Sequence, residues 1–197
     1  MDLTNKNKIK TLFSKVTLFI SLYENFLQGY EESILAFYAN NITFDNGAAV
    51  YGFAGVDGKP DKRAKEEYEK AVHRTRKKNN GDWDRDLSLF NWLRKSGIIT
   101  DEHFEQLKEI RLLRNKLVHE LDSFLGGEFP EDFEEKLDQL VRIRKHATKW
   151  WYLEIEYPTD PEGTHPFDIQ TADLDEVKVI GNSDMFYDLI KEIIEGK

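Results

Sequence analysis

The apolar residues of this chain recur at intervals of three and four positions, and this spacing limits its fold more than any other feature. In the first stretch, residues 3–39, the positions with this spacing are Leu12, Phe13, Val16, Phe19, Ile20, Tyr23, Phe26 and Leu27. An α-helix has about 3.6 residues per turn, so these side chains share one face that can be buried. The same spacing recurs over residues 107–125 and over residues 185–194. The sequence therefore predicts an all-α protein, built as an antiparallel bundle of long helices.

Turn and capping residues divide the chain further. Residues 40–60 are rich in Gly and Asn, so they form either a small hairpin or an ordered loop. After the first stretch, in which Gly29 is a candidate break, Thr100 is expected to cap one helix and Pro130 to open another. The later helices are predicted over residues 60–79, 87–93, 100–125 and 131–152.

Acidic charge is concentrated near the C-terminus. Residues 150–197 hold 3 of the 28 lysines and arginines but 12 of the 37 acidic residues, so they account for the net charge of −9. We expect a helical domain over residues 1–157 and an acidic extension over 158–197, ending in an amphipathic helix capped by Ser183. The extension is interpreted either as a solubilising appendage or as a segment that covers a nucleic-acid-binding cleft.

The remainder of the chain is close to neutral and contains a basic strip, whose members are Lys70, Arg74, Arg76, Lys77 and Lys78. Two interpretations of this strip remain open: local phosphate binding, or the solvated face of a helix.

Several classes of protein do not fit the composition. The sequence has no run of about 18 apolar residues, so no membrane-spanning helix is expected. Its first ten residues are polar, and no secretory signal is expected. Cysteine is absent, which excludes disulfides and thiolate metal sites and makes a cytoplasmic location the default expectation. No cofactor or metal is expected, because four histidines lack the pairing typical of a metal site: His73, His103, His146 and His165.

A polar pattern of chemical interest lies in the helix predicted over residues 100–125. Arg114 is followed directly by Asn115, and His119 comes five positions after the arginine. At about 100° per residue, Asn115 and His119 share a face with Leu112. Arg114 lies at the edge of the apolar stripe, so its long stem would carry the guanidinium toward the histidine face. The predicted core stripe consists of Leu107, Ile110, Leu113, Leu117, Val118, Leu121, Phe124 and Leu125.

This arrangement resembles the R-x4-H signature of HEPN proteins, in which a polar residue follows the arginine. The turn over residues 97–102 is similar to the one that precedes the helix in that family, and the resemblance covers about residues 86–125. It implies a HEPN-like bundle and a metal-independent endoribonuclease of a toxin–antitoxin or antiphage abortive-infection system. It also implies a homodimer that joins the Arg114–His119 helices of two subunits.

The residue types suit the implied chemistry, which is attack of an RNA 2′-hydroxyl on the adjacent phosphate. An imidazole such as that of His119 exchanges protons near neutral pH, and the guanidinium of Arg114 can bind two phosphate oxygens. Asn115 would orient the histidine or donate to the phosphate. Arg111 and Lys116 are the candidate RNA-binding residues beside this catalytic set.

A different reading assigns these residues no catalysis. Arg114 would then pair with a buried glutamate, Glu24 or Glu31, and His119 would be an interface histidine. The chain would be a non-catalytic HEPN dimerisation or sensor module within a defence complex. A partner such as an antitoxin is compatible with both interpretations. In one toxin subgroup the partner modifies a tyrosine two positions after the histidine, but Leu121 stands there in this chain, so that mode of neutralisation is not expected.

Overall fold

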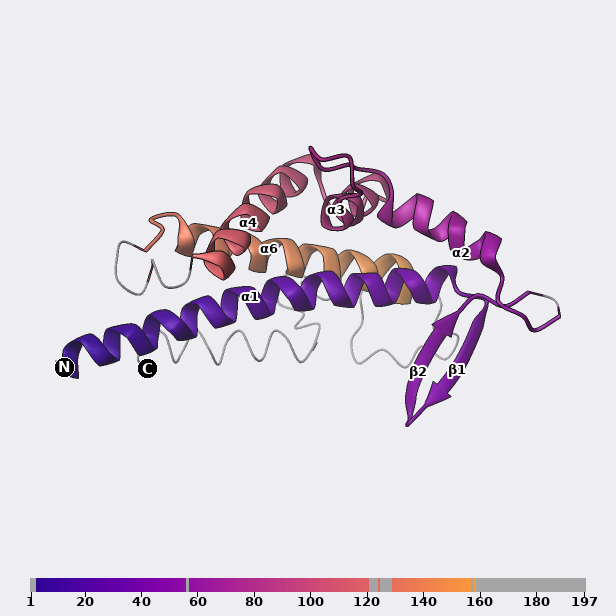
Figure 1. Ribbon diagram of the computed structural model, residues 1–197, viewed down its shortest axis with the longest axis horizontal. Helices are drawn as coiled ribbons and strands as arrows, with labels where there is room; N and C mark the ends of the chain where they lie inside the picture. The colour runs from indigo at the N-terminus through magenta and orange to yellow at the C-terminus, as the bar shows by residue number, and fades with distance from the viewer. Residues whose placement is uncertain (1–2, 56, 121–123, 125–128, 157, 159–197) are drawn as a thin grey trace. The chain divides into compact units, whose positions relative to one another are not determined.

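A computed structural model describes residues 3–55, 57–120, 124, 129–156 and 158. It is largely helical with one small two-stranded sheet, which confirms the helical part of the predicted fold class (Figure 1). The chain forms two compact units. We call Glu24–Gly97 the hairpin unit, and Met1–Tyr23 together with Ile98–Lys197 the three-helix unit, after the three long helices to which its described residues belong. The predicted boundary at residue 158 and the helix after Ser183 involve residues outside this description.

The first helix, α1 (Leu3–Tyr38), contributes residues to both units and runs unbroken through Gly29. The expected break is therefore wrong. Glycine inside a helix costs about 1 kcal/mol relative to alanine, but burial of a single large apolar side chain contributes more than this. Phe26 and Ile34, on either side of the glycine, are both buried and keep the helix continuous.

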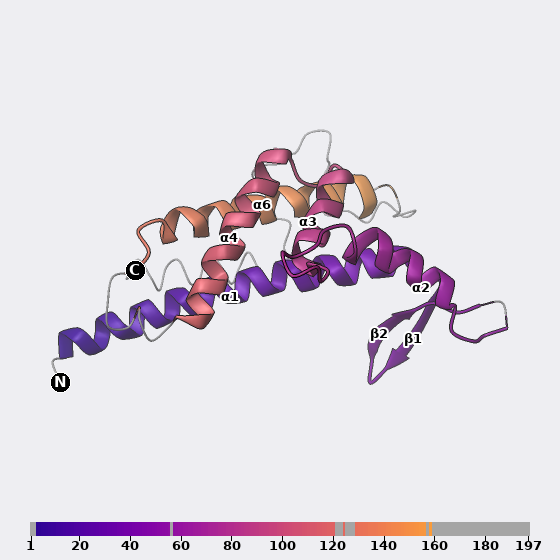
Figure 2. The same cartoon turned by 45° about the horizontal axis from the view of Figure 1, so that its top comes forward.

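The hairpin unit contains the two antiparallel strands β1 (Asn41–Asp45) and β2 (Ala48–Gly52), seen beside α2 in Figure 2. Asn46 and Gly47 join them with φ angles of 49° and 84°. Positive φ at both central residues is the requirement of the tight hairpin turn that Asn-Gly favours. The hairpin interpretation of residues 40–60 is confirmed.

Three short helical elements complete this unit: α2 (Lys62–Tyr68), the π-helical turn η1 (Glu69–His73) and α3 (Arg85–Lys95). The prediction of one helix as far as residue 79 is wrong beyond His73. The backbone leaves the helical region at Arg74, and the amides of Thr75 and Arg76 donate to Ser88 Oγ at 3.2 and 3.0 Å. Most of the basic strip therefore lies on a loop.

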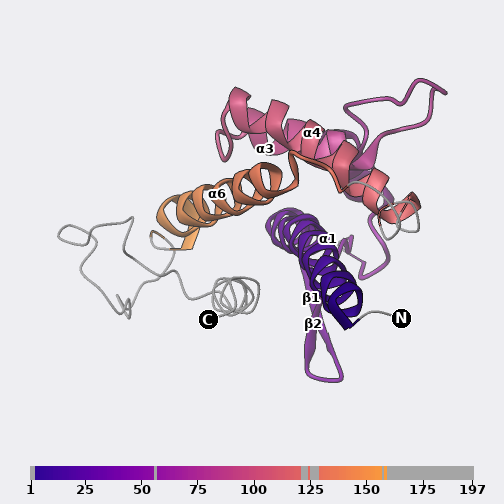
Figure 3. The same ribbon diagram turned by 90° about the vertical axis from the view of Figure 1, so that its left-hand side faces the viewer.

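The three-helix unit combines α1 up to Tyr23 with α4 (Asp101–His119) and α6 (Phe133–Trp151), which Figure 3 shows together. Each pair of helices is joined by a side-chain contact. These contacts are Phe19–Phe133 for α1 and α6 (ring centroids 5.4 Å apart), the Lys136–Glu109 ion pair for α6 and α4, and Arg114–Tyr23 for α4 and α1.

Two helix ends in this unit differ from expectation. The helix α4 ends at His119, because Glu120 adopts φ −120° and ψ 22°, whereas the sequence predicted an end near Leu125. The glycines expected to stop it, at 126 and 127, lie outside the described residues. The helix α6 begins at Phe133 and continues into a π-helical turn, η2 (Tyr152–Glu156), so the chain after Trp151 stays helical.

Candidate functional site

The helix α4 carries the residues singled out in the sequence, and its start is held firmly. Thr100 is the N-cap, as predicted: its hydroxyl oxygen accepts a hydrogen bond from the backbone N–H of His103 at 3.1 Å. The imidazole of His103 accepts in return from the backbone N–H of Thr100 at 3.5 Å. Such a reciprocal cap satisfies two backbone donors that the first turn leaves unpaired.

A buried stripe fixes the rotation of α4 about its axis. Its members, Phe104, Leu107, Ile110, Leu113 and Leu117, are all buried. The predicted core stripe is thus confirmed for four of its positions and for Phe124, but Val118 is 42% exposed and does not belong to it. Leu121 and Leu125 lie outside the described residues.

The side of α4 opposite this stripe carries the polar pair. Asn115 is half-buried and His119, the last residue of the helix, is exposed. Because they are four residues apart, they lie on one face. Leu112 and Val118 beside them are 65% and 42% exposed. We call Leu112, Asn115, Val118 and His119 the α4 outer face.

Arg114 lies at the edge of this face and is half-buried. Its Nη1 donates to Asn115 Oδ1 at 3.1 Å, and its Cζ lies 5.9 Å from the ring centroid of Tyr23. The attraction between a guanidinium and an aromatic ring, added to the hydrogen bond, restricts the orientation of the charged group. The structure thus gives Asn115 a contact with Arg114, whereas the sequence analysis expected Asn115 to orient His119 or to donate to the phosphate.

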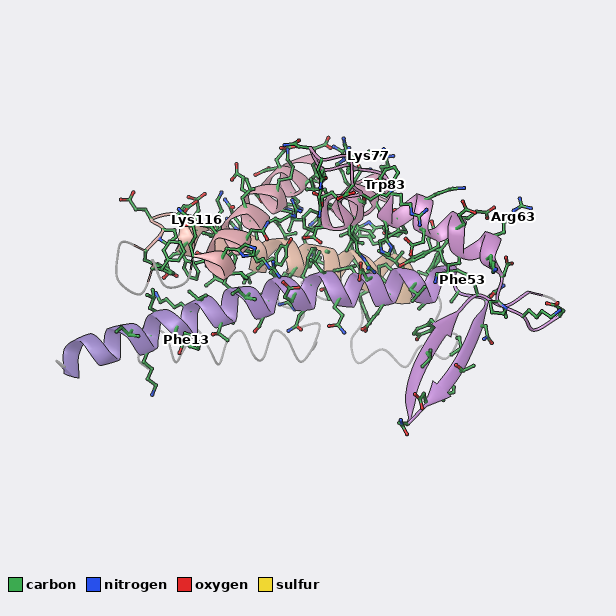
Figure 4. The ribbon with its side chains drawn as sticks, viewed as in Figure 1. Phe13, Phe53, Arg63, Lys77, Trp83 and Lys116 are labelled. Atoms are coloured by element: carbon green, nitrogen blue, oxygen red, sulfur yellow. The ribbon has the colours of Figure 1, made fainter. Side chains whose placement is uncertain are left out.

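The two predicted RNA-binding residues occupy different sides of α4. Arg111 is half-buried and Lys116 is exposed, and five positions of helix separate their directions by about 140°. The ammonium of Lys116, a residue labelled in Figure 4, lies 5.6 Å from the ring centroid of Phe124. Lys116 comes three residues before His119 and is therefore its neighbour on the helix surface, and its role in RNA binding stays a prediction.

A cluster of ionisable residues around the buried His73, in the hairpin unit, was not found from the sequence. His73, buried on η1, has Nε2 at 3.2 Å from Glu31 Oε1 and Nδ1 at 3.4 Å from Glu69 Oε2. Arg85 Nε donates to the same Glu31 oxygen at 2.6 Å. The Glu69–His73 spacing of four residues was the one local signal, because Glu31 and Arg85 are far apart in the chain.

This cluster shifts the ionisation of its members. Burial acts to raise the pKa of Glu31, but the contacts with His73 and Arg85 outweigh it, and the pKa lies below its ordinary value of 4.5. Burial, with the nearby charge of Glu31, raises the pKa of Tyr68 to about 12. Glu31 is thereby occupied within the hairpin unit by His73 and Arg85, the partners that the sequence did not indicate.

Two of the four histidines that show no pairing in the sequence lie next to each other in the three-helix unit. The rings of His103 on α4 and His146 on α6 have centroids 4.8 Å apart. Burial, together with His146, lowers the pKa of His103. No group of three or more His, Asp or Glu side chains able to hold a metal ion occurs in the part of the chain that the structure describes.

Comparison with protein families, with curated proteins and with solved structures finds no match to this chain. Within the described ranges, no helix combines the length and the apolar character needed to cross a membrane.

Proposed function

We propose that this protein is a HEPN-type endoribonuclease that needs no metal ion, and that its active site is completed when the α4 outer faces of two copies meet. One observation carries the proposal. The α4 outer face presents an exposed imidazole and an amide held by Arg114, flanked by two exposed apolar side chains. The R-x4-H resemblance supplies the reaction class.

The reaction needs two proton transfers and one cationic group. The 2′-hydroxyl loses its proton to a base while its oxygen forms a bond to phosphorus. The bond from phosphorus to the 5′-oxygen then breaks, and an acid protonates that oxygen. The products are a 2′,3′-cyclic phosphate and a 5′-hydroxyl. Imidazoles can serve as base and acid, and a guanidinium can neutralise the charge that builds up on the phosphate oxygens.

Arg114 is suited to the phosphate role by its placement. Its contacts with Asn115 and Tyr23 restrict the guanidinium at the edge of the α4 outer face. A guanidinium presents five N–H donors in a planar fork, a geometry that matches two oxygens of a phosphate. Asn115 thus acts by positioning Arg114.

The need for a second copy follows from the histidine count on this face. Within one chain, His119 is the imidazole of the α4 outer face, whereas the reaction uses a base and an acid. A two-fold axis beside α4 would bring the second imidazole from the other copy, since such an interface uses the same patch twice. Leu112 and Val118 would supply the apolar contact area that holds the two faces together.

The test compares purified wild type with His119→Ala and Arg114→Ala on a mixed-sequence RNA in EDTA. Loss of a proton-transferring group is expected to slow cleavage about 100-fold or more. His146→Ala, which removes an exposed histidine from α6, is the matched control and should cut like wild type. Equal cleavage by all variants, or activity that disappears in EDTA, would reject the proposal.

A second candidate is a HEPN module that dimerises without cutting RNA. The exposed Leu112 and Val118 support this candidate as much as they support the ribonuclease, because an apolar interface does not require catalysis. A tight dimer with no RNA cleavage would select this candidate. We further propose a role in a toxin–antitoxin or antiphage system, which predicts that expression of the wild type harms cells and expression of His119→Ala does not.

A further inference from the structure

A second surface with features of nucleic-acid binding lies in the hairpin unit, on the segment between η1 and α3. We call residues 74–84 the basic loop. Its cationic members are Arg74, Arg76, Lys77 and Lys78, and all four are exposed. In Figure 4 the labelled side chains of Lys77 and Trp83 lie together on this loop.

The loop has a defined backbone. Lys77 and Trp83 face each other across an antiparallel bridge. The backbone N–H of Lys78 donates to the carbonyl of Asp82 at 2.7 Å, and that of Asp84 donates to the carbonyl of Arg76 at 2.8 Å. The loop is thus a short ribbon, in which directly opposed side chains lie on the same side.

Buried polar residues of α3 anchor the base of this ribbon. Ser88 and Asn91 are 0% and 2% exposed. Ser88 Oγ accepts from the amides of Thr75 and Arg76, while Asn91 Nδ2 donates to Thr75 Oγ1 at 3.1 Å. Burying polar groups is unfavourable unless they are hydrogen-bonded. Most of their hydrogen bonds go to Thr75 and Arg76, which fixes the backbone at the base of the loop, and Asn91 Oδ1 also accepts from Arg94.

Trp83 gives this surface a second property. Among the four tryptophans of the chain it is the exposed one, at 45%, although tryptophan usually packs inside. The ammonium of Lys77 lies 4.9 Å from the centroid of its ring system. The loop therefore offers an aromatic platform whose immediate neighbour is a cation.

The acidic residues in and beside the loop neutralise the charge of its cations only in part. Asp84 is buried and serves as the N-cap of α3, where it accepts from Leu87 N at 3.1 Å. Asp82 is exposed and accepts a hydrogen bond from Asn80. Arg74 lies 3.9 Å from Glu69, at the edge of ion-pair range. Lys77 and Lys78 are the cations nearest the tip of the ribbon.

We infer that the basic loop binds single-stranded RNA, with an unpaired base stacked on Trp83 and phosphates contacted by Lys77 and Lys78. An accessible ring can stack on a base only if the base is unpaired, which favours a single strand over a duplex. The neighbouring cations suit the phosphates on either side of that base. The inference builds on the proposed RNA substrate and adds its strand form and a contact surface.

The experiment measures binding apart from cleavage. Full-length His119→Ala protein is titrated into a fluorescent single-stranded RNA of about 12 nucleotides in EDTA, and anisotropy is recorded. In this background, Trp83→Ala is expected to weaken binding roughly 5- to 150-fold, whereas Trp83→Phe keeps most of the affinity. Thermal unfolding of each variant checks that the fold is intact.

Charge variants provide a second, independent readout. Lys77→Gln combined with Lys78→Gln should reduce the slope of log affinity against log salt by about 1.4, because each phosphate contact on a single strand contributes about 0.7. The matched control is Lys62→Gln combined with Lys65→Gln, two exposed lysines on α2, which should leave the slope unchanged.

Three results would overturn the inference: Trp83→Ala binding within twofold of its parent, a duplex of the same sequence binding as tightly, or an acidic peptide competing as well as RNA. The two proposals fail separately. Trp83-dependent RNA binding without any cleavage by wild type rejects the ribonuclease and keeps the loop. Cleavage that depends on His119, together with RNA binding that Trp83→Ala leaves unchanged, rejects the loop and keeps the ribonuclease.

Discussion

The packing of α1 in the three-helix unit can be tested by one substitution made at two positions. Phe19 is 0% exposed, and its ring centroid lies 5.4 Å from that of Phe133 on α6. Removing a fully buried phenylalanine ring costs about 3–5 kcal/mol, a range that includes the cavity left behind. Alanine has the higher helix propensity, which returns about 0.5 kcal/mol. We therefore expect Phe19→Ala to lower the free energy of unfolding by about 2.5–4.5 kcal/mol.

Phe13 is the matched control, because it lies on the same helix and is 53% exposed (Figure 4). Phe13→Ala loses about half of the transfer free energy and gains the same helix propensity, so its cost should stay below about 1 kcal/mol. Urea unfolding followed by circular dichroism measures both variants. Equal costs at the two positions would refute the described orientation of α1.

Three further substitutions have defined outcomes. Because the pKa of Glu31 in the folded protein lies below 4.5, its carboxylate stabilises the fold above about that pH, and this stabilisation is lost as the pH falls through the folded pKa. Glu31→Gln should therefore be less stable at neutral pH and lose less stability in acid, as urea midpoints across this range would show. Thr100→Ala should cost about 1 kcal/mol of unfolding free energy through loss of the α4 cap, and a cost near zero would contradict the cap. Leu112→Asp should leave unfolding within about 0.5 kcal/mol but convert dimers to monomers in sedimentation, since this side chain is 65% exposed in the single chain.

Local features were predicted well from the sequence. The spacing of Leu107, Ile110, Leu113 and Leu117 placed the buried side of α4, and Thr100 placed its start, because periodicity and capping are encoded by near neighbours. Asn46-Gly47 indicated the hairpin turn for the same reason.

Features set by distant residues were missed. Phe13 and Val118 fit the apolar spacing but are exposed, since the pattern cannot tell how wide a stripe the neighbouring helices cover. The basic loop was predicted as helix because its anchor, Ser88, comes 12 residues after Arg76. The contact of Arg85 with Glu31 spans 54 positions of the chain and has no local signature.

For the candidate site, the sequence indicated the residues and the structure adds their setting. The Arg114–Asn115 contact was not predicted, although the two residues are adjacent, and the position of the Tyr23 ring beneath the guanidinium depends on how α1 packs against α4. Lys116 was assigned to RNA from its charge, and it lies exposed three residues before His119 on the same helix.

The shared active site is tested most directly by mixing an active and an inactive protein. Wild type and an excess of His119→Ala are unfolded together and refolded, so that most wild-type copies are paired with a copy that lacks the imidazole. Because the reaction uses one imidazole from each copy, as base and as acid, the account predicts that RNA cleavage by the mixture falls well below that of the same amount of wild type alone. Cleavage that stays proportional to the amount of wild type, in a mixture that contains verified heterodimers, would contradict it.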